Sequence, residues 1–140
     1  MISSLPYRLG VGLVIINSNS QILTGRRLDS TKAWQMPQGG IDDNEIPLEA
    51  AYREMGEETG IEKCKVVLLK QSKLWHRYDL PNELQGEFWG GKFRGQSQKW
   101  FLFKFIGVDS DINIETKEPE FADWRWSTKS DMFDSIVPFK

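Results

Sequence analysis

The pattern of apolar and polar positions along the chain predicts several short strands around one helix. Residues 9–17 are largely apolar and rich in β-branched side chains, and a polar turn at 18–20 leads into residues 21–27. Short apolar runs joined by a turn are typical of neighbouring strands. Similar runs predict further strands at residues 64–71, 74–78, 98–106 and 124–126.

Two segments between these runs lack a regular pattern and are predicted to be loops. Residues 31–41 contain two glycines and a proline, and residues 81–96 contain four glycines. Loops of the second length are uncommon within compact domains and are often functional. A short helix is predicted near the end of the chain, at residues 130–136.

Residues 44–59 show the one clear helical pattern. Asn44 is suited to cap the helix, Pro47 fits its first turn, and Gly60 follows its end. One side of the helical wheel is apolar and holds Leu48, Ala51, Tyr52 and Met55. We expect this side to pack on a mixed sheet, which predicts an α/β fold.

Three glutamates share the adjoining side of this helix. Glu54 is three residues before Glu57 and four before Glu58, so their side chains are neighbours. Like charges at that spacing destabilise a helix by about 0.2–0.5 kcal/mol per pair. Helix stability therefore does not account for the cluster by itself. Arg53 can offset the repulsion by pairing with Glu49 or Glu57, which keeps a purely structural explanation open.

The charges are unevenly distributed along a chain with a formal net charge of −2. Residues 41–62 carry one basic and eight acidic side chains, and residues 63–108 carry nine basic and three acidic ones. The fold can thus place carboxylates beside Lys and Arg, which suits a polyanion bound through a divalent cation. The charge does not favour general coating of nucleic acid, so DNA is not an expected partner.

Length and composition exclude several classes of protein. The 140 residues are 39% hydrophobic and 27% charged, which is typical of one globular domain, expected to span residues 1–140. Apolar runs are too short to cross a bilayer and no signal peptide is apparent, so we expect a cytoplasmic protein without a membrane partner. Cys64, expected to be buried, and His76 are the only residues of their kinds. A bound metal must therefore be held by oxygen.

A longer pattern surrounds the glutamates. Gly39 is followed six residues later by Glu45, and eight residues after that Arg53 begins the run Arg-Glu-Met-Gly-Glu-Glu-Thr-Gly-Ile. Residues 39–61 thereby resemble the Nudix box, which is glycine, five residues, glutamate, seven residues, then Arg-Glu-apolar-any-Glu-Glu-any-Gly-apolar. The resemblance implies the Nudix fold, an α/β/α sandwich around a mixed β-sheet, and hydrolysis of a pyrophosphate linkage.

Segments outside the box narrow the resemblance. They read Trp-Gln-Met-Pro-Gln-Gly-Gly at 34–40, Tyr-Asp-Leu-Pro at 78–81, Gly-Gln-Ser-Gln-Lys-Trp-Phe at 95–101 and Pro-Glu-Phe-Ala-Asp-Trp-Arg-Trp at 119–126. In this order they are similar to the bacterial RNA pyrophosphohydrolase and dinucleoside polyphosphate hydrolase branch of the Nudix superfamily. The implied partner is an RNA 5′ end or a dinucleoside polyphosphate, and no protein partner is identified.

The resemblance also implies a metal site and catalytic roles. The implied ligands of Mg²⁺ or Mn²⁺, with two or more ions when substrate is bound, are Glu54, Glu57, Glu58 and Glu120. A backbone carbonyl near Gln38 or Gly39 is expected as a further ligand. The implied catalytic residues are Arg53, Glu54, Glu57 and Glu120. Both Glu54 and Glu120 are candidates for the general base.

Substrate-binding residues are implied in the same way. The phosphate and 5′-end positions are Arg8, Arg27, Gln96 and Lys99, and Gln38 is a further substrate-binding position. Tyr78 matches an aromatic that contacts the nucleobase or phosphates in dinucleotide-hydrolysing relatives, and the positions around a base near the RNA 5′ end are Val137, Phe139 and Lys140. The leading hypothesis is a metal-dependent hydrolase that removes pyrophosphate or phosphate from the 5′-triphosphate or 5′-diphosphate end of RNA. A diadenosine tetra- or pentaphosphate hydrolase is the alternative, and a non-catalytic nucleotide-binding module is a third reading.

Overall fold

The structure is a computed structural model that describes residues 5–28, 34–80 and 91–128. Its strands and helices are β1 (Tyr7–Ile16), β2 (Ile22–Arg27), β3 (Trp34–Gln35), β4 (Gln38–Gly40), α1 (Pro47–Thr59), the 3-10 turn η1 (Lys63–Lys65), β5 (Val66–Gln71), β6 (His76–Asp79), β7 (Gly95–Phe105), the 3-10 turn η4 (Asp109–Asp111) and β8 (Phe121–Ser127).

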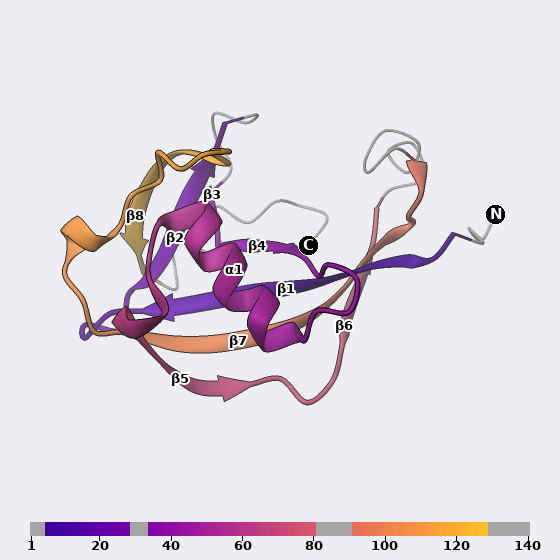
Figure 1. The fold of residues 1–140 in the computed structure, drawn as a ribbon, viewed down its shortest axis with the longest axis horizontal. Coiled ribbons are helices and arrows are strands. Elements are labelled where there is room, and N and C mark those ends of the chain that lie inside the picture. The colour runs from indigo at the N-terminus through magenta and orange to yellow at the C-terminus, as the bar shows by residue number, and fades with distance from the viewer. Residues whose placement is uncertain (1–4, 29–33, 81–90, 129–140) are drawn as a thin grey trace.

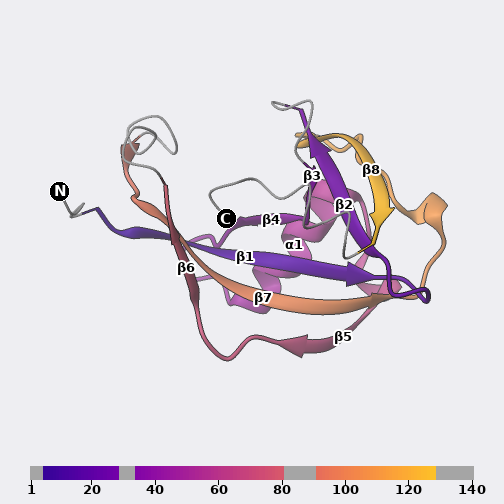
Figure 2. The same ribbon diagram turned by 180° about the vertical axis from the view of Figure 1, so that it is seen from behind.

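The strands form one mixed sheet with the order β3-β2-β1-β7-β5, to which β4, β6 and β8 add by pairing with β1, β7 and β2 (Figures 1 and 2). β1 and β7 run parallel, and the other pairs are antiparallel. The predicted mixed sheet of an α/β fold is confirmed. α1 supplies one helical layer, and the helix predicted at 130–136 lies outside the described residues. No helix in the described ranges has the length and apolar character needed to cross a membrane.

α1 packs on one side of β1 and β7, which we call the helix face of the sheet. Side chains alternate along a strand, so Val11, Leu13 and Ile15 all point to this face and are fully buried. They join one core with Met55 of α1 and Phe103 of β7. The apolar side of the predicted helix therefore packs on the sheet as expected, and its other sides stay available for chemistry.

α1 begins at Pro47 rather than Asn44, so the predicted cap is wrong. Ile46 has an extended backbone (φ −76°, ψ 138°) and caps the helix without a side-chain hydrogen bond. The residue before a proline is disfavoured in the helical region, which prevents an earlier start. Asn44 instead has a positive φ of 64° in the preceding turn. The end is as predicted, with Gly60 left-handed at a φ of 71°.

The segment predicted as a loop at 31–41 contains two short strands, β3 and β4. β4 pairs with β1, with Gly40 opposite Gly10 and Gln38 opposite Gly12. Glycine has a low strand propensity, so the composition of this segment hides the strand. The correction matters for function because β4 contacts both β1 and α1 (Figure 1).

Three strands begin earlier than predicted: β1 at Tyr7 rather than residue 9, β7 at Gly95 rather than residue 98, and β8 at Phe121 rather than residue 124. The first residues of β7 are buried although they are polar, and their backbone pairs with β1 and with β6. Alternation of apolar residues cannot reveal a strand whose buried side chains are polar. Residues 95 and 96 of the predicted loop at 81–96 thus belong to β7, and residues 81–90 of that prediction lie outside the described residues.

The segment between α1 and β6 also differs in detail from the prediction. β5 begins at Val66 rather than residue 64, because the 3-10 turn η1 precedes it. Cys64 lies in this turn and is exposed, so its predicted burial is wrong. β6 spans His76–Asp79 rather than residues 74–78.

Candidate active site

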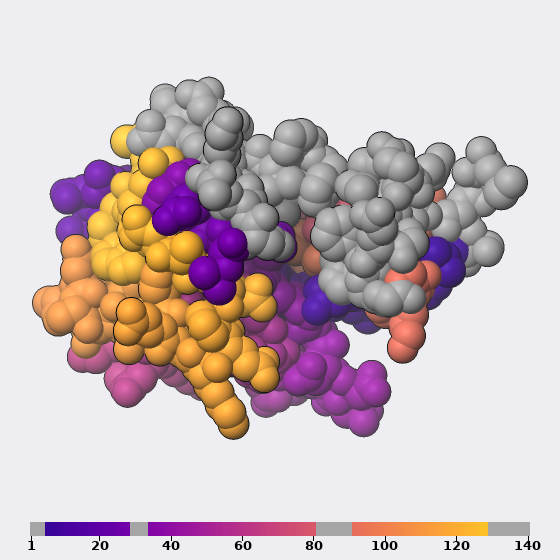
Figure 3. Space-filling view, turned by 90° about the horizontal axis from the view of Figure 1, so that it is seen from above, coloured from indigo at the N-terminus to yellow at the C-terminus, as the bar shows by residue number. Residues whose placement is uncertain are grey.

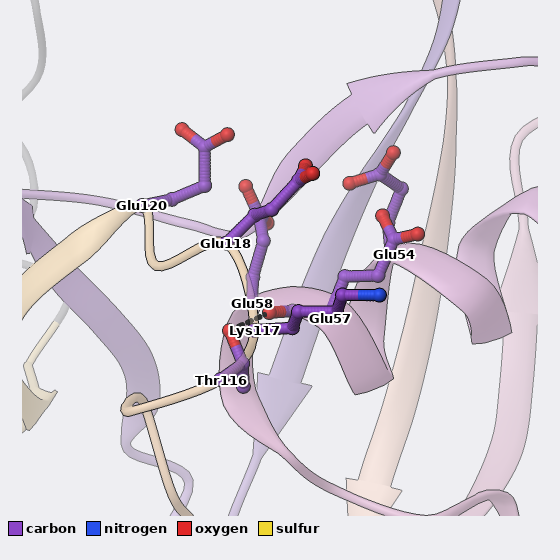
Figure 4. A pocket seen from close by; sticks show the side chains of 7 residues that line it. All are labelled: Glu54, Glu57, Glu58, Thr116, Lys117, Glu118 and Glu120. Atoms are coloured by element: carbon purple, nitrogen blue, oxygen red, sulfur yellow. Dashed lines mark hydrogen bonds between the residues drawn. The ribbon is translucent and has the colours of Figure 1, made fainter.

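Carboxylates from two distant segments line one pocket of about 240 Å³. Its lining consists of Glu54, Glu57 and Glu58 from α1 and Thr116, Lys117, Glu118 and Glu120 from the segment before β8 (Figure 4). The Thr116 hydroxyl donates a hydrogen bond to the Glu57 carbonyl, which connects the segment before β8 to α1. The structure thus brings Glu120 together with the three glutamates of the helix.

Figure 3 shows the same neighbourhood from above. The orange and yellow surface of the segment that leads into β8, and of β8 itself, borders the purple and magenta surface around α1.

Thr116, Lys117 and Glu118 were not predicted as site residues, because their irregular segment has no periodicity. Their one signal in the sequence is proximity to Glu120, itself implied by the family resemblance.

Arg53 joins several carboxylates around the pocket. Its guanidinium donates hydrogen bonds of 2.8–3.0 Å to the carboxylates of Glu45, Glu54 and Glu57 and to the carbonyl of Gly40. The predicted pairing with Glu57 is present, whereas Glu45 takes the place expected for Glu49. A cation shared by neighbouring carboxylates offsets their repulsion, so the structural explanation for the cluster holds in part.

Glu54 is a carboxyl group of the pocket whose pKa departs strongly from its ordinary value. Burial raises its pKa to about 7, although the hydrogen bond from Arg53 lowers it. Desolvation disfavours the charged form of a carboxyl group, and a nearby cation favours it. Glu54 can therefore exchange a proton near neutral pH, and a divalent cation beside it would favour the carboxylate.

Two consecutive glycines of β4 lie against groups of opposite charge. A Cβ atom on Gly39 would overlap the carboxylate of Glu54, and one on Gly40 would overlap the guanidinium of Arg8. Only glycine allows such a close approach of the backbone. β4 therefore separates the acidic pocket from a basic group on its other side.

Gln38 connects α1 to β7. Its backbone amide donates a hydrogen bond of 2.9 Å to Oε2 of Glu58, and its side-chain oxygen accepts one of 2.9 Å from Nε2 of Gln98. The same Nε2 donates to Oε1 of Gln96 at 3.1 Å. Gln98 was not predicted as a site residue, and its signal is the spacing of two from Gln96, which places both glutamines on one face of β7.

Arg8, Gln96 and Tyr78 form a row across three strands, which we call the polar row. Arg8 of β1 lies opposite Gln96 of β7, which lies opposite Tyr78 of β6. Residues opposite one another point to the same face, so three of the implied substrate residues come together. Burial raises the pKa of Tyr78 to about 12, so its hydroxyl stays protonated at neutral pH and can donate a hydrogen bond.

The other implied substrate residues lie elsewhere. Arg27, at the end of β2, lines a second pocket of about 260 Å³ with Leu28, Glu118, Pro119 and Glu120. Lys99 follows Gln98 in β7 and points to the helix face, away from the polar row; its ammonium lies 5.5 Å from the centre of the Trp75 ring. Three positions lie outside the described residues, namely Val137, Phe139 and Lys140.

The donor chemistry of the pocket fits a hard divalent cation. Five carboxylates and one ammonium line it, and Mg²⁺ and Mn²⁺ prefer oxygen ligands. As the side chains lie, no three acidic, histidine or cysteine residues in the described ranges converge closely enough to hold an ion. Arg53 holds Glu54 and Glu57 at 2.8 and 3.0 Å, so a cation would compete with it for these carboxylates.

Curated relatives match nearly the whole chain. An RNA pyrophosphohydrolase from Rhodospirillum rubrum is 54% identical over 138 residues, which cover 99% of this chain and 82% of the relative. A protein of the same name from Dinoroseobacter shibae is 51% identical over 140 residues, which cover 99% of this chain and 88% of the relative.

Solved structures share the fold. A C. elegans Ap4A hydrolase binary complex aligns with a TM-score of 0.65 at 23% identity, over 90% of this chain and 84% of that one. The E. coli dihydroneopterin triphosphate pyrophosphohydrolase aligns with a TM-score of 0.72 at 18% identity, over 94% of this chain and 88% of that one. Residues 6–139 match the NUDIX domain family, and together with relatives that are half identical this shows that the chain belongs to the Nudix hydrolases.

Proposed function

We propose that this Nudix hydrolase removes pyrophosphate or phosphate from the 5′-triphosphate or 5′-diphosphate end of RNA. The observation that carries the proposal is the pocket in which the three glutamates of the box and Glu120 gather beside β4. Sequence identities of 54% and 51% to proteins named RNA pyrophosphohydrolase support RNA as the substrate. The cytoplasmic location expected from the sequence is part of this proposal.

The charges on the two sides of β4 suit a polyphosphate. Glu54 lies against Gly39 on one side, and Arg8 lies against Gly40 on the other. A 5′-triphosphate carries several negative charges, which Arg8 can neutralise directly and which the carboxylates can neutralise only through bound cations. Tyr78 and Gln96 beside Arg8 add neutral hydrogen-bonding groups for phosphate oxygens.

The acidic residues of the pocket have the role of metal ligands in this proposal. The proposed ligands are Glu54, Glu57, Glu58, Glu120 and the carbonyl of Gly39. When bound, Mg²⁺ or Mn²⁺ supplies charge neutralisation and an acidified water. Arg53 positions Glu54 and Glu57 through its hydrogen bonds. Glu54 and Glu120 are both candidates for the base, and the pKa of about 7 suits Glu54 to accept a proton near neutral pH.

Release of pyrophosphate and phosphate from 5′-triphosphorylated RNA tests the proposal. The wild-type chain should release them with Mg²⁺ or Mn²⁺, and Glu57→Gln should lower kcat on the order of a hundredfold because a pocket carboxylate is lost. Glu49→Gln is the matched control, since Glu49 is exposed on the first turn of the same helix and outside the pocket. Full activity of Glu57→Gln would overturn the metal assignment.

The alternative substrate is a dinucleoside polyphosphate, which the same site suits. A comparison of kcat/KM on 5′-triphosphorylated RNA and on diadenosine tetraphosphate decides between the two. A higher value on the dinucleotide would overturn the choice of RNA and keep the hydrolase. Binding of RNA without hydrolysis of either substrate would favour the non-catalytic module instead.

A further inference from the structure

A strip of cationic and apolar side chains lies on the helix face of the sheet, at the end where β6 pairs with β7. We call it the cationic strip, and it consists of Tyr7, Leu9, Trp75, Arg77, Arg94 and Lys99. Arg77 and Leu9 both lie opposite Ser97, and Tyr7 lies opposite Gly95, the next position on this face. Residues from three neighbouring strands thus form one continuous surface.

Cation–aromatic contacts hold the charged members of the strip in place. The guanidinium carbons of Arg77 and Arg94 lie 5.2 and 4.9 Å from the centre of the Tyr7 ring. Lys99 lies over the Trp75 ring in the same way. Figure 3 agrees with this proximity, since the salmon surface at the start of β7 lies against the indigo start of β1. These distances are within the range of favourable cation–π interactions.

Two of the three cations of the strip, Arg77 and Lys99, have no carboxylate partner among the described residues. Arg94 pairs with Asp79 through two hydrogen bonds of 3.1 Å. The charges of Arg77 and Lys99 are therefore available to an anionic partner.

Apolar side chains are exposed between these charges. Leu9 is 52% exposed and Trp75 is 38% exposed. Phosphate-binding cations interleaved with exposed aromatic rings are the usual platform for single-stranded nucleic acid, because every base has a face that can stack. A negatively charged peptide would use the cations but would gain little from the aromatic rings.

The cationic strip and the polar row lie on opposite faces of the same strands, and their residues are neighbours along the chain. Tyr7 precedes Arg8 and Arg77 precedes Tyr78, and consecutive residues of a strand point to opposite faces. β6 has a partner strand on one side only among the described strands, so it forms the edge of the sheet here. A strand of RNA that leaves the polar row reaches the strip by passing over this edge.

We infer that the cationic strip binds the RNA chain beyond its first nucleotides, an inference that rests on the proposed function. Arg77 and Lys99 contact phosphates, and Trp75 stacks with a base. Such contacts are independent of sequence and position the RNA without reading it. The strip therefore favours long single-stranded substrates over short ones.

Kinetics on two substrate lengths test the inference. The substrates are a 5′-triphosphorylated dinucleotide and an unstructured 5′-triphosphorylated RNA of about ten nucleotides. Trp75→Ala should raise KM for the long RNA by about tenfold, and Arg77→Gln should reduce the salt dependence of log KM by about 0.7. Neither variant should change kcat/KM for the dinucleotide. Lys70→Gln is the matched control, since Lys70 is an exposed cation on β5 outside the strip.

A binding measurement provides a readout that does not depend on turnover. Fluorescence anisotropy with unphosphorylated RNA should show weaker binding by Trp75→Ala and Arg77→Gln and unchanged binding by Lys70→Gln. Equal binding by all of these proteins overturns the inference, and so does competition by polyglutamate as effective as that by RNA. Failure of the wild-type chain to hydrolyse either substrate overturns the proposed function instead. Thermal unfolding of each variant separates these outcomes from a loss of fold.

Discussion

Gly39 lies so close to the carboxylate of Glu54 that a Cβ atom on the glycine would overlap it. The two residues meet because β4 lies directly against α1 (Figure 1). The next residue, Gly40, accepts a hydrogen bond of 2.8 Å from Arg53, which also holds Glu54. The glycine at the start of the box thus has a steric role in placing the first of the three glutamates.

Gly39→Ala tests this role. The added methyl group must displace Glu54 or move β4, so we expect kcat to fall at least tenfold. Forcing an extra carbon into a packed site costs about 1–3 kcal/mol, which should appear as a lower free energy of unfolding in urea. An alanine variant with wild-type kcat would show that the contact is unimportant for catalysis.

Gly56→Ala is a second prediction and the control for the first. Gly56 is also a glycine of the box segment, but a Cβ atom there would meet nothing within 4 Å. Alanine is favoured over glycine inside a helix by about 1 kcal/mol, so this variant should unfold at higher urea concentration. Its kcat should equal that of the wild-type chain, because the substitution touches no pocket side chain.

The sequence predicted the helix of the site better than the strands around it. Glu54, Glu57 and Glu58 could be placed on one side of a helix from their spacing alone, because the helical period is regular. The polar start of β7 could not be recognised, since Gln96 and Gln98 are buried by pairing on both sides rather than by being apolar. Hydrogen bonds between strands that are distant in the chain leave no signal in the local sequence.

Contacts between distant segments also escaped prediction from the residues themselves. The position of Glu120 beside α1 came from the family resemblance, because no spacing rule links two segments so far apart in the chain. Lys99 was implied as a substrate residue together with Gln96, but alternation along β7 turns the two side chains to opposite faces. That alternation could be applied only once the start of β7 was known.

Arg53→Lys should keep the positive charge at this position but lower both the stability of the chain and its kcat. Lysine cannot reproduce the planar fork with which Arg53 binds three carboxylates and a carbonyl. We expect a loss of about 1–3 kcal/mol in the free energy of unfolding and roughly a tenfold lower kcat. Because the bond from Arg53 lowers the pKa of Glu54, the pH–rate profile should also shift to higher pH. Arg26→Lys, which changes an arginine away from the pocket, should have none of these effects.

Divalent cations should stabilise the folded chain. A cation at a hundred times its Kd adds about 2.7 kcal/mol to the free energy of unfolding, so Mn²⁺ should raise Tm by several degrees and EDTA should reverse the rise. Glu120→Gln should reduce this shift because it removes a pocket carboxylate. Glu115→Gln, in the same segment but outside the pocket, should keep the full shift. A wild-type shift in Glu120→Gln would exclude that residue as a ligand.

Glu54 should make stability depend on pH when EDTA keeps cations away. Its folded-state pKa is about 7, above the ordinary value of 4.5, so the folded chain keeps a proton that the unfolded chain loses between these values. The stability contributed by this group therefore falls as pH rises through that window, by roughly 3 kcal/mol in all. Glu54→Gln removes this titrating group. The free energy of unfolding of the variant, relative to that of the wild-type chain, should therefore rise by that amount from about pH 4 to about pH 8. Asp79, whose pKa is lowered by Tyr7 and Arg94, lies outside the Arg53 network and cancels in the difference. Glu45 shares Arg53 with Glu54, and because its pKa is lowered in the folded chain, its contribution is confined to the acidic end of the range. A difference that does not change with pH would mean that Glu54 titrates normally in the folded chain.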